Sequence, residues 1–165
     1  MAAYNKFNTF VEAMANGLIQ MSSTGHTFSL MLSNTVPTST MKTSTDITEI
    51  STQNGYAHLG STCQITSSTL GSTTVVPTPV IVLGPAAGVV LTASSAQSTA
   101  GIGPFRYVVL LDQSTAYAAG IPSGFGTITG PILVSWYDYG SAITLNPGET
   151  FTTTFDATSG ILQVA

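Results

Sequence analysis

Seven carboxylates and two histidines are the side chains of this 165-residue chain that could act as acids, bases or metal ligands. They are Glu12, Asp46, Glu49, Asp112, Asp138, Glu149, Asp156, His26 and His58. Asp46, Asp138 and Glu149 stand where turns or element ends are expected, and there a carboxylate commonly accepts hydrogen bonds from nearby backbone N–H groups. We therefore expect the carboxylates to support local structure, and we predict no catalytic residue.

The sequence lacks the spacings that mark common active sites. It has no Gly-x-Ser-x-Gly nucleophile elbow and no Walker-type phosphate loop, and its Gly-Phe-Gly run at 124–126 lacks the third glycine of a dinucleotide-binding turn. His26 and His58 lie far apart without a cysteine nearby, which is not the spacing of a structural zinc site. We predict no cofactor and no metal, and we expect the single Cys63 to be a buried apolar side chain.

Charged residues are scarce in this chain. Only 3 residues are Lys or Arg and 7 are Asp or Glu, which is 6% of the chain, against about 25% in a typical soluble domain. Hydroxyl residues, 27 Thr and 19 Ser, supply the polarity instead. Three cations neutralise too few phosphates to hold DNA or RNA, so we predict no nucleic-acid partner. A monomer of this size exposes roughly 7,700 Å². So low a number of charged residues for this surface area predicts that a permanent assembly covers much of the surface.

Neither a leader nor a membrane span is predicted. The first ten residues contain Asn5, Lys6 and Asn8 and no apolar core of the kind that a secretory signal has. The most apolar stretch, 80–91, is interrupted by Gly84 and Pro85 and is shorter than the roughly 20 residues of a membrane-spanning helix. We expect a protein that stays in the cytoplasm where it is made, with no membrane partner.

The N-terminal segment, residues 1–20, is predicted to be helical. Apolar residues recur there at intervals of three and four, and Gly17 is a typical helix stop. The apolar stripe consists of Tyr4, Phe7, Val11, Met14 and Leu18, and Phe10 and Ala15 widen it. A stripe this broad must dock on a sheet of the same chain or on a neighbouring subunit.

After the helix the apolar period changes to two, which predicts strands. Phe28, Leu30 and Leu32 alternate with other residues, and Asn54-Gly55 favours a tight turn. Residues 61–74 are rich in hydroxyls without a clear period, so we expect a surface loop or an edge excursion there. Residues 75–82 carry two prolines, which predicts an edge strand or a bulged segment.

The remaining chain predicts several further strands. The expected strands are 87–94, 105–112 (the most buried), 131–137, 142–145, 151–155 and 161–164, with turns at 138–140 and 146–149 and a long loop at 113–130. Short strands at intervals of about 8 to 12 residues are typical of antiparallel sandwiches. The predicted fold is mainly β: one domain, 1–165, whose body at 26–165 is an antiparallel β-sandwich or jelly roll, with one N-terminal α-helix.

Aromatic residues supply the remaining binding candidates. Trp136 is expected on one face of its strand and Tyr137 and Tyr139 on the other, so at least one set should be core. Phe125 lies in the long loop, and loops of that length are often functional. The candidate contacts with another subunit or partner are Tyr4, Phe7, Val11, Met14, Phe125, Trp136, Tyr137 and Tyr139.

An ordered series of stretches resembles a widespread family of small virion proteins of tailed bacteriophages. The stretches are YNKFNTFVEAMANG at 4–17, FSLMLSNTVPT at 28–38, DITEISTQNGY at 46–56, GPFRYVVLLD at 103–112 and SWYDYGSAITLNPGETFTTTFDATSGIL at 135–162. The resemblance implies a non-enzymatic component of the phage particle, assembled in the cytoplasm of the bacterial host. Residues 61–83 depart most from the family pattern.

Within a virion, capsid decoration fits the resemblance best. A cement protein of this kind would sit on the capsid exterior as a homotrimer and bind the major capsid protein and copies of itself. One alternative is a tail or fibre component that binds host saccharide through the 113–130 loop and the face with Tyr137 and Tyr139. Another is a small hydrolase that depends on His26 and His58.

Overall fold

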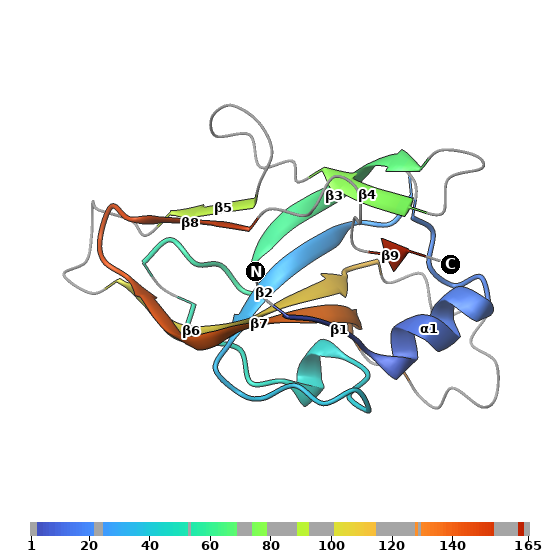
Figure 1. Cartoon of the computed structure of the whole chain (residues 1–165), viewed down its shortest axis with the longest axis horizontal. Coiled ribbons are helices and arrows are strands. Elements are labelled where there is room, and N and C mark those ends of the chain that lie inside the picture. The colour runs from blue at the N-terminus through green and yellow to red at the C-terminus, as the bar shows by residue number, and fades with distance from the viewer. Residues whose placement is uncertain are drawn as a thin grey trace.

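The structure is a computed structural model that describes residues 3–21, 25–52, 54–68, 74–78, 89–92, 101–114, 128, 130–153 and 162–163. In these ranges the chain is mainly β, with antiparallel strand pairs and one α-helix (Figure 1). The elements are β1 (Ala3–Lys6), α1 (Asn8–Ala15), β2 (Phe28–Ser33), the short 3-10 helix η1 (Ser44–Asp46), β3 (Ser61–Ser68), β4 (Thr74–Thr78), β5 (Val89–Thr92), β6 (Ile102–Asp112), β7 (Ile132–Leu145), β8 (Thr150–Thr153) and β9 (Leu162–Gln163).

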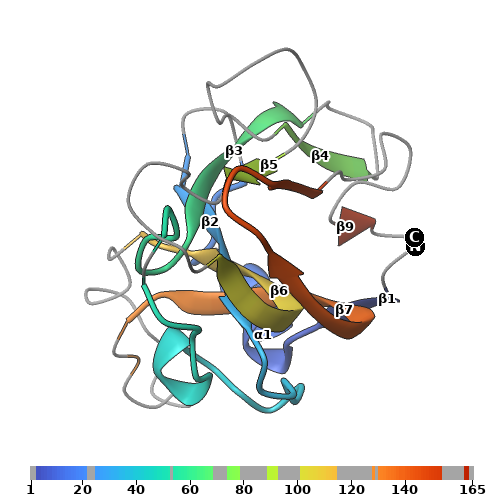
Figure 2. The same ribbon diagram turned by 90° about the vertical axis from the view of Figure 1, so that its left-hand side faces the viewer.

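Most described strands belong to a single antiparallel sheet. Its order is β1-β7-β6-β2-β3-β4-β9, and β5 and β8 form a separate antiparallel pair. The sheet curls, so that β3 and β4 lie opposite β6 and β7 and its two ends, β1 and β9, come to the same side of the molecule (Figure 2). No helix in the described part of the chain is long and apolar enough to span a bilayer.

The central strands β2 and β6 are buried on both faces. Every residue of β2 is buried, and so are residues 107–112 of β6. The pairs Leu30–Leu110 and Met31–Val109 point to opposite faces of the sheet. The sheet therefore separates a first core cluster, which contains Leu30 and Leu110, from a second core cluster, which contains Met31 and Val109.

The predicted N-terminal helix is wrong at its start. Residues 3–6 are a strand, because their backbone pairs with residues 135–138 of β7, and Tyr4 lies opposite Tyr137. The helix covers only Asn8–Ala15, and its buried residues are Thr9, Phe10 and Ala13, of which only Phe10 belongs to the predicted stripe. The backbone N–H and C=O groups of residues 3–6 could form hydrogen bonds either in a longer helix or in the sheet. The available partner strand β7 decides for the sheet.

Gly17 ends the helix as predicted. It has a φ of 67°, and its N–H donates to the Met14 carbonyl at 3.0 Å, while Leu18 N–H donates to the Ala13 carbonyl at 2.9 Å. These are the two hydrogen bonds of a Schellman cap, which needs a residue with positive φ at this position. The helix then docks on β7 of its own chain.

Two further boundaries differ from the predictions. Residues 61–68 are the strand β3, which pairs with β2 and β4, so the expected loop is wrong there. The predicted turn at 138–140 is a bulge within the continuous strand β7: Phe105 pairs with Ile143 and Tyr107 with Asp138, so four residues of β7 stand opposite Arg106. Gly140, with a φ of 82°, permits this bulge.

Other local predictions are confirmed. Asn54 and Gly55 have φ values of 58° and 99°, as a two-residue turn of this type requires. Glu149 N–H donates to the Asn146 carbonyl at 2.9 Å and closes the predicted turn. The prediction for the proline segment is not borne out: the register shift between β3 and β4 places the extra residue in β3, between Ile65 and Ser67, and β4 lies between β3 and β9 rather than at an edge of the sheet. The predicted strand ends at 154–155, 161 and 164, and Asp156, lie outside the described residues.

We predict opposite outcomes for two apolar residues that the sequence places in one stripe. Phe7 is 0% exposed in the second core cluster, and Val11 on α1 is 51% exposed. Phe7→Ala should lower the free energy of unfolding by about 3–5 kcal/mol, because it leaves a cavity. Val11→Ala, the control, should change it by less than about 0.5 kcal/mol. Urea unfolding measures both, and similar losses in the two variants would contradict the placement of Phe7 in the core.

Asp46 should give stability a defined dependence on pH. Its carboxylate accepts backbone hydrogen bonds from Thr43 at 2.9 Å and Lys42 at 2.8 Å, which lower its pKa below the ordinary value of 3.8. Because the folded-state pKa is the lower one, this stabilisation is complete above the unfolded-state value and is lost as the pH falls through the folded-state value. The stability difference between wild type and Asp46→Asn should be constant near neutral pH and should shrink below about pH 4. Urea unfolding at stepped pH measures it, and a difference that persists in acid would contradict this role.

Candidate functional site

A long connection between β2 and β3 positions a polar network that joins it to the sheet. This connection, residues 34–60, is called the covering segment here. It contributes Ile47 to the second core cluster, with Met41 and Leu59 packed beside it. Backbone hydrogen bonds fix it to the sheet, including Ile50 N–H to the Leu32 carbonyl at 3.1 Å and Leu133 N–H to the Lys42 carbonyl at 3.0 Å.

Glu49 is the centre of this polar network. Its Oε1 accepts hydrogen bonds from the Tyr56 hydroxyl at 2.7 Å and from Leu59 N–H at 2.6 Å. Its Oε2 lies 2.6 Å from Nδ1 of His58. The Tyr56 hydroxyl in turn accepts a hydrogen bond from Leu32 N–H at 2.8 Å. A chain of hydrogen bonds therefore runs from β2 through Tyr56 and Glu49 to His58.

The network becomes more exposed from Tyr56 toward His58. Tyr56 is buried, and burial raises the pKa of its hydroxyl far above the ordinary value, so Tyr56 stays protonated and acts as a donor to Glu49. The Glu49 side chain is 13% exposed and that of His58 is 74% exposed. A carboxylate bound to Nδ1 orients a histidine, as in general-base sites. No described hydroxyl or thiol, however, is hydrogen-bonded to His58.

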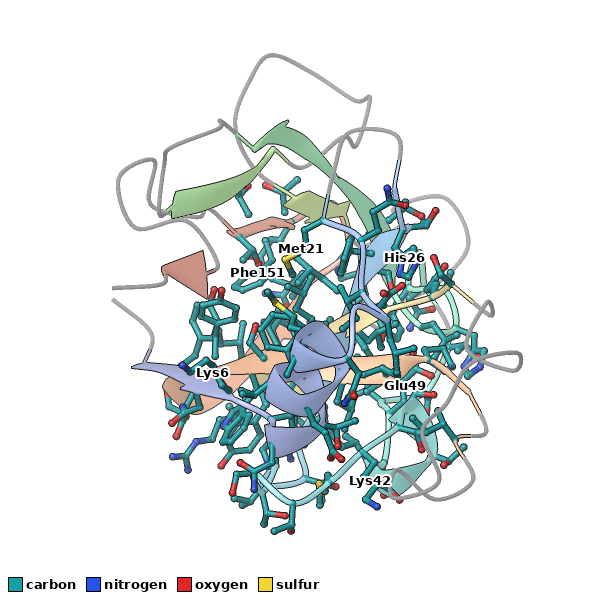
Figure 3. All side chains as sticks on the ribbon, turned by 90° about the vertical axis from the view of Figure 1, so that its right-hand side faces the viewer. Lys6, Met21, His26, Lys42, Glu49 and Phe151 are labelled. Atoms are coloured by element: carbon teal, nitrogen blue, oxygen red, sulfur yellow. The ribbon has the colours of Figure 1, made fainter. Side chains whose placement is uncertain are left out.

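A second histidine–carboxylate pair lies at the end of β6. Nδ1 of His26 is 2.6 Å from Oδ2 of Asp112, whose side chain is 0% exposed. Oδ1 of Asp112 accepts the Ser114 N–H at 2.9 Å, and Ser114 Oγ accepts the Thr27 N–H at 3.1 Å. The pair therefore ties the chain before β2 to the chain after β6. His26 and Glu49 lie apart in Figure 3, so the two pairs are separate sites.

Arg106 and Asp138 form an ion pair across the bulge of β7. Two hydrogen bonds join them, from Nε at 2.7 Å and from Nη2 at 2.8 Å. The guanidinium lowers the pKa of Asp138, as does the Gly140 N–H, and the carboxylate raises the pKa of Arg106. The guanidinium also lies 5.2 Å from the centre of the Tyr107 ring. Asp138 thus stabilises a bulge rather than the predicted turn.

The aromatic residues of β7 lie on opposite faces, as predicted. Trp136 packs beside the second core cluster, with its ring 4.5 Å from that of Phe7. Tyr137 and Tyr139 pack against the first core cluster. Tyr139 contacts Phe151 of β8 at 5.2 Å between ring centres, and burial raises the pKa of its hydroxyl. These aromatics therefore contact the core of this chain.

The other contact candidates are spread over the structure. Tyr4 lies in β1, Phe7 is core, Val11 is exposed on α1, and Met14 packs against the first core cluster. Phe125 lies outside the described residues. The structure does not bring the described candidates into a single surface patch, because Phe7 and Met14 belong to clusters on opposite faces of the sheet.

Sequence reasoning missed the polar network around Glu49. Glu49, Tyr56 and His58 have no spacing that matches a known catalytic or metal motif. Only the turn at Asn54-Gly55, which folds the chain back, indicated that residues on its two sides approach one another. Within the described residues, no group of three or more His, Cys, Asp or Glu side chains converges as a metal site would require.

Glu49→Gln should weaken the attachment of the covering segment. Glutamine has nearly the shape of glutamate but lacks the negative charge that interacts with Tyr56, Leu59 and His58. We therefore expect the free energy of unfolding to fall by about 1.5–3 kcal/mol. Glu12→Gln is the matched control, since Glu12 is exposed on α1 and should change stability by less than about 0.5 kcal/mol. Thermal and urea unfolding measure both, and equal stability of the two variants would contradict the anchoring role of Glu49.

Most of the described carboxylates have separate local partners. Asp46 caps a turn, Glu49 anchors the covering segment, Asp112 binds His26 and Asp138 binds Arg106. Each site holds one carboxylate, so the described residues do not place two of them together for acid–base catalysis.

Comparisons with protein-family models, with curated proteins and with solved structures find no match for this chain.

Proposed function

We propose that this chain is a structural virion protein of a tailed bacteriophage. In the proposed role it is a capsid decoration, or cement, protein that binds the outside of the major capsid protein shell and stabilises it. The observation that carries the proposal is the use of charge. The chain has 10 charged residues for an accessible surface of 8476 Å², and the carboxylates Asp46, Glu49, Asp112 and Asp138 are bound to groups of the chain itself.

A surface with so few available charges suits permanent burial. Solvent-exposed proteins stay soluble mainly through surface charge, and a neutral surface favours association. Obligate interfaces commonly bury 2,000 Å² or more, and on a neutral surface they would rest on apolar contact and on hydroxyl or backbone hydrogen bonds. Thr and Ser residues, abundant in this chain, provide such bonds without the desolvation penalty of a charge.

The proposal also includes a fold and a set of partners. The curled sheet and the separate β5–β8 pair (Figure 2) support an antiparallel sandwich or jelly roll as the finer description. The proposed partners are the major capsid protein and copies of the chain in a homotrimer. The proposed location is the capsid exterior, after synthesis in the cytoplasm of the bacterial host.

Copy number in the purified particle tests the proposal. Quantitative mass spectrometry should find hundreds of copies of this chain per virion, in a fixed ratio to the major capsid protein, because a cement protein follows the capsid lattice. Purified protein should also rebind expanded capsids that lack it. A few copies per particle would overturn the capsid location and favour the tail or fibre alternative, and absence from the particle would overturn a virion role.

A further inference from the structure

The chain contains two Asn-Gly pairs, Asn16-Gly17 and Asn54-Gly55, in different settings. In such a pair the glycine backbone nitrogen can attack Cγ of the asparagine. The new N–Cγ bond replaces the Cγ–Nδ2 bond, the glycine proton leaves with the amide nitrogen as ammonia, and a succinimide forms. Water then opens this ring to aspartate or isoaspartate. The reaction needs only water, and glycine offers little steric hindrance to it.

Asn16-Gly17 is held by hydrogen bonds at both reacting groups. The nucleophile, Gly17 N–H, donates to the Met14 carbonyl at 3.0 Å. The departing group, Nδ2 of Asn16, donates to the Glu12 carbonyl at 2.8 Å. Both bonds belong to the Schellman cap region of α1, which Leu18 N–H also closes. The attack therefore requires both of these hydrogen bonds to break.

In Asn54-Gly55, only the departing amide of the asparagine is held by a hydrogen bond among the described residues. Nδ2 of Asn54 donates to the Gly101 carbonyl at 2.8 Å, a bond that joins the covering segment to the start of β6. Gly55 is exposed, and in the described part of the chain its N–H makes no hydrogen bond. Breaking a single side-chain hydrogen bond therefore frees both reacting groups, and such local openings need less free energy than larger ones.

We propose that Asn54 is a site of spontaneous deamidation in the folded protein and that Asn16, in the same dipeptide, is protected. The product carboxylate has no donor for the Gly101 carbonyl, so the tie between the covering segment and β6 is lost. Isoaspartate also adds a backbone atom to a turn that needs positive φ at both residues. Tyr56, which binds Glu49, lies two residues further on, so deamidation loosens the network around Glu49.

The two asparagines react in the same sample, so Asn16 serves as the internal control for Asn54. The full-length folded protein is incubated in mildly alkaline buffer at physiological temperature, and each asparagine is followed by peptide mass spectrometry. We expect Asn54 to convert at least about tenfold faster than Asn16 in the folded protein. In guanidinium chloride, where the hydrogen bonds are absent, the two rates should be similar. Equal conversion in the folded protein, earlier conversion of Asn16, or an unreactive Asn54 would overturn the proposal.

The predicted consequence has a separate readout. Asn54→Asp should raise hydrogen exchange at residues 54–60 several-fold, whereas Asn16→Asp should raise it only at the end of α1. Unchanged exchange at residues 54–60 in Asn54→Asp would refute the loss of the tie. Since purified protein is used throughout, the outcome is independent of the copy number in the virion.

Discussion

The central strands β2 and β6 are buried on both faces, and the fold must keep water from both. An antiparallel sheet often leaves one face in solvent, but here Leu30, Leu110 and their neighbours need one cover, and Met31 and Val109 need another. The helix α1, Tyr56 of the covering segment and Phe151 of β8 cover the first face. Phe7 and the covering segment cover the second.

This requirement explains why a long irregular connection is so firmly attached. A segment without strand pairing has many backbone groups to satisfy, and buried ones are costly when they are left unpaired. The covering segment satisfies them through the cap at Asp46, through the bonds of Ile50 and Leu133, and through Glu49. Four of the described carboxylates, Asp46, Glu49, Asp112 and Asp138, thus bind groups of the chain itself.

Internal use of charge links the fold to the proposed role. In the described residues, Glu49 and Asp112 each orient one histidine at separate sites. In the proposed role as a cement protein, the effect on a shell would come from contact area and from a stable fold.

The sequence by itself determined the local features. The Asn54-Gly55 turn and the Gly17 helix stop follow from positive φ, and the buried strand at 105–112 follows from its run of apolar side chains, and both causes act within a few residues. The same local chemistry placed Trp136 and Tyr137 on opposite faces of one strand.

Only the tertiary structure decided which competing local patterns prevailed. Residues 3–6 form a strand because β7 offers them a partner, and residues 61–68 form a strand because β2 and β4 do. The partners of Asp138 and Glu49 lie on other strands or across a turn. Hydrogen bonds between residues distant in sequence depend on how the whole chain closes around its two cores, and no periodicity or spacing carries that information.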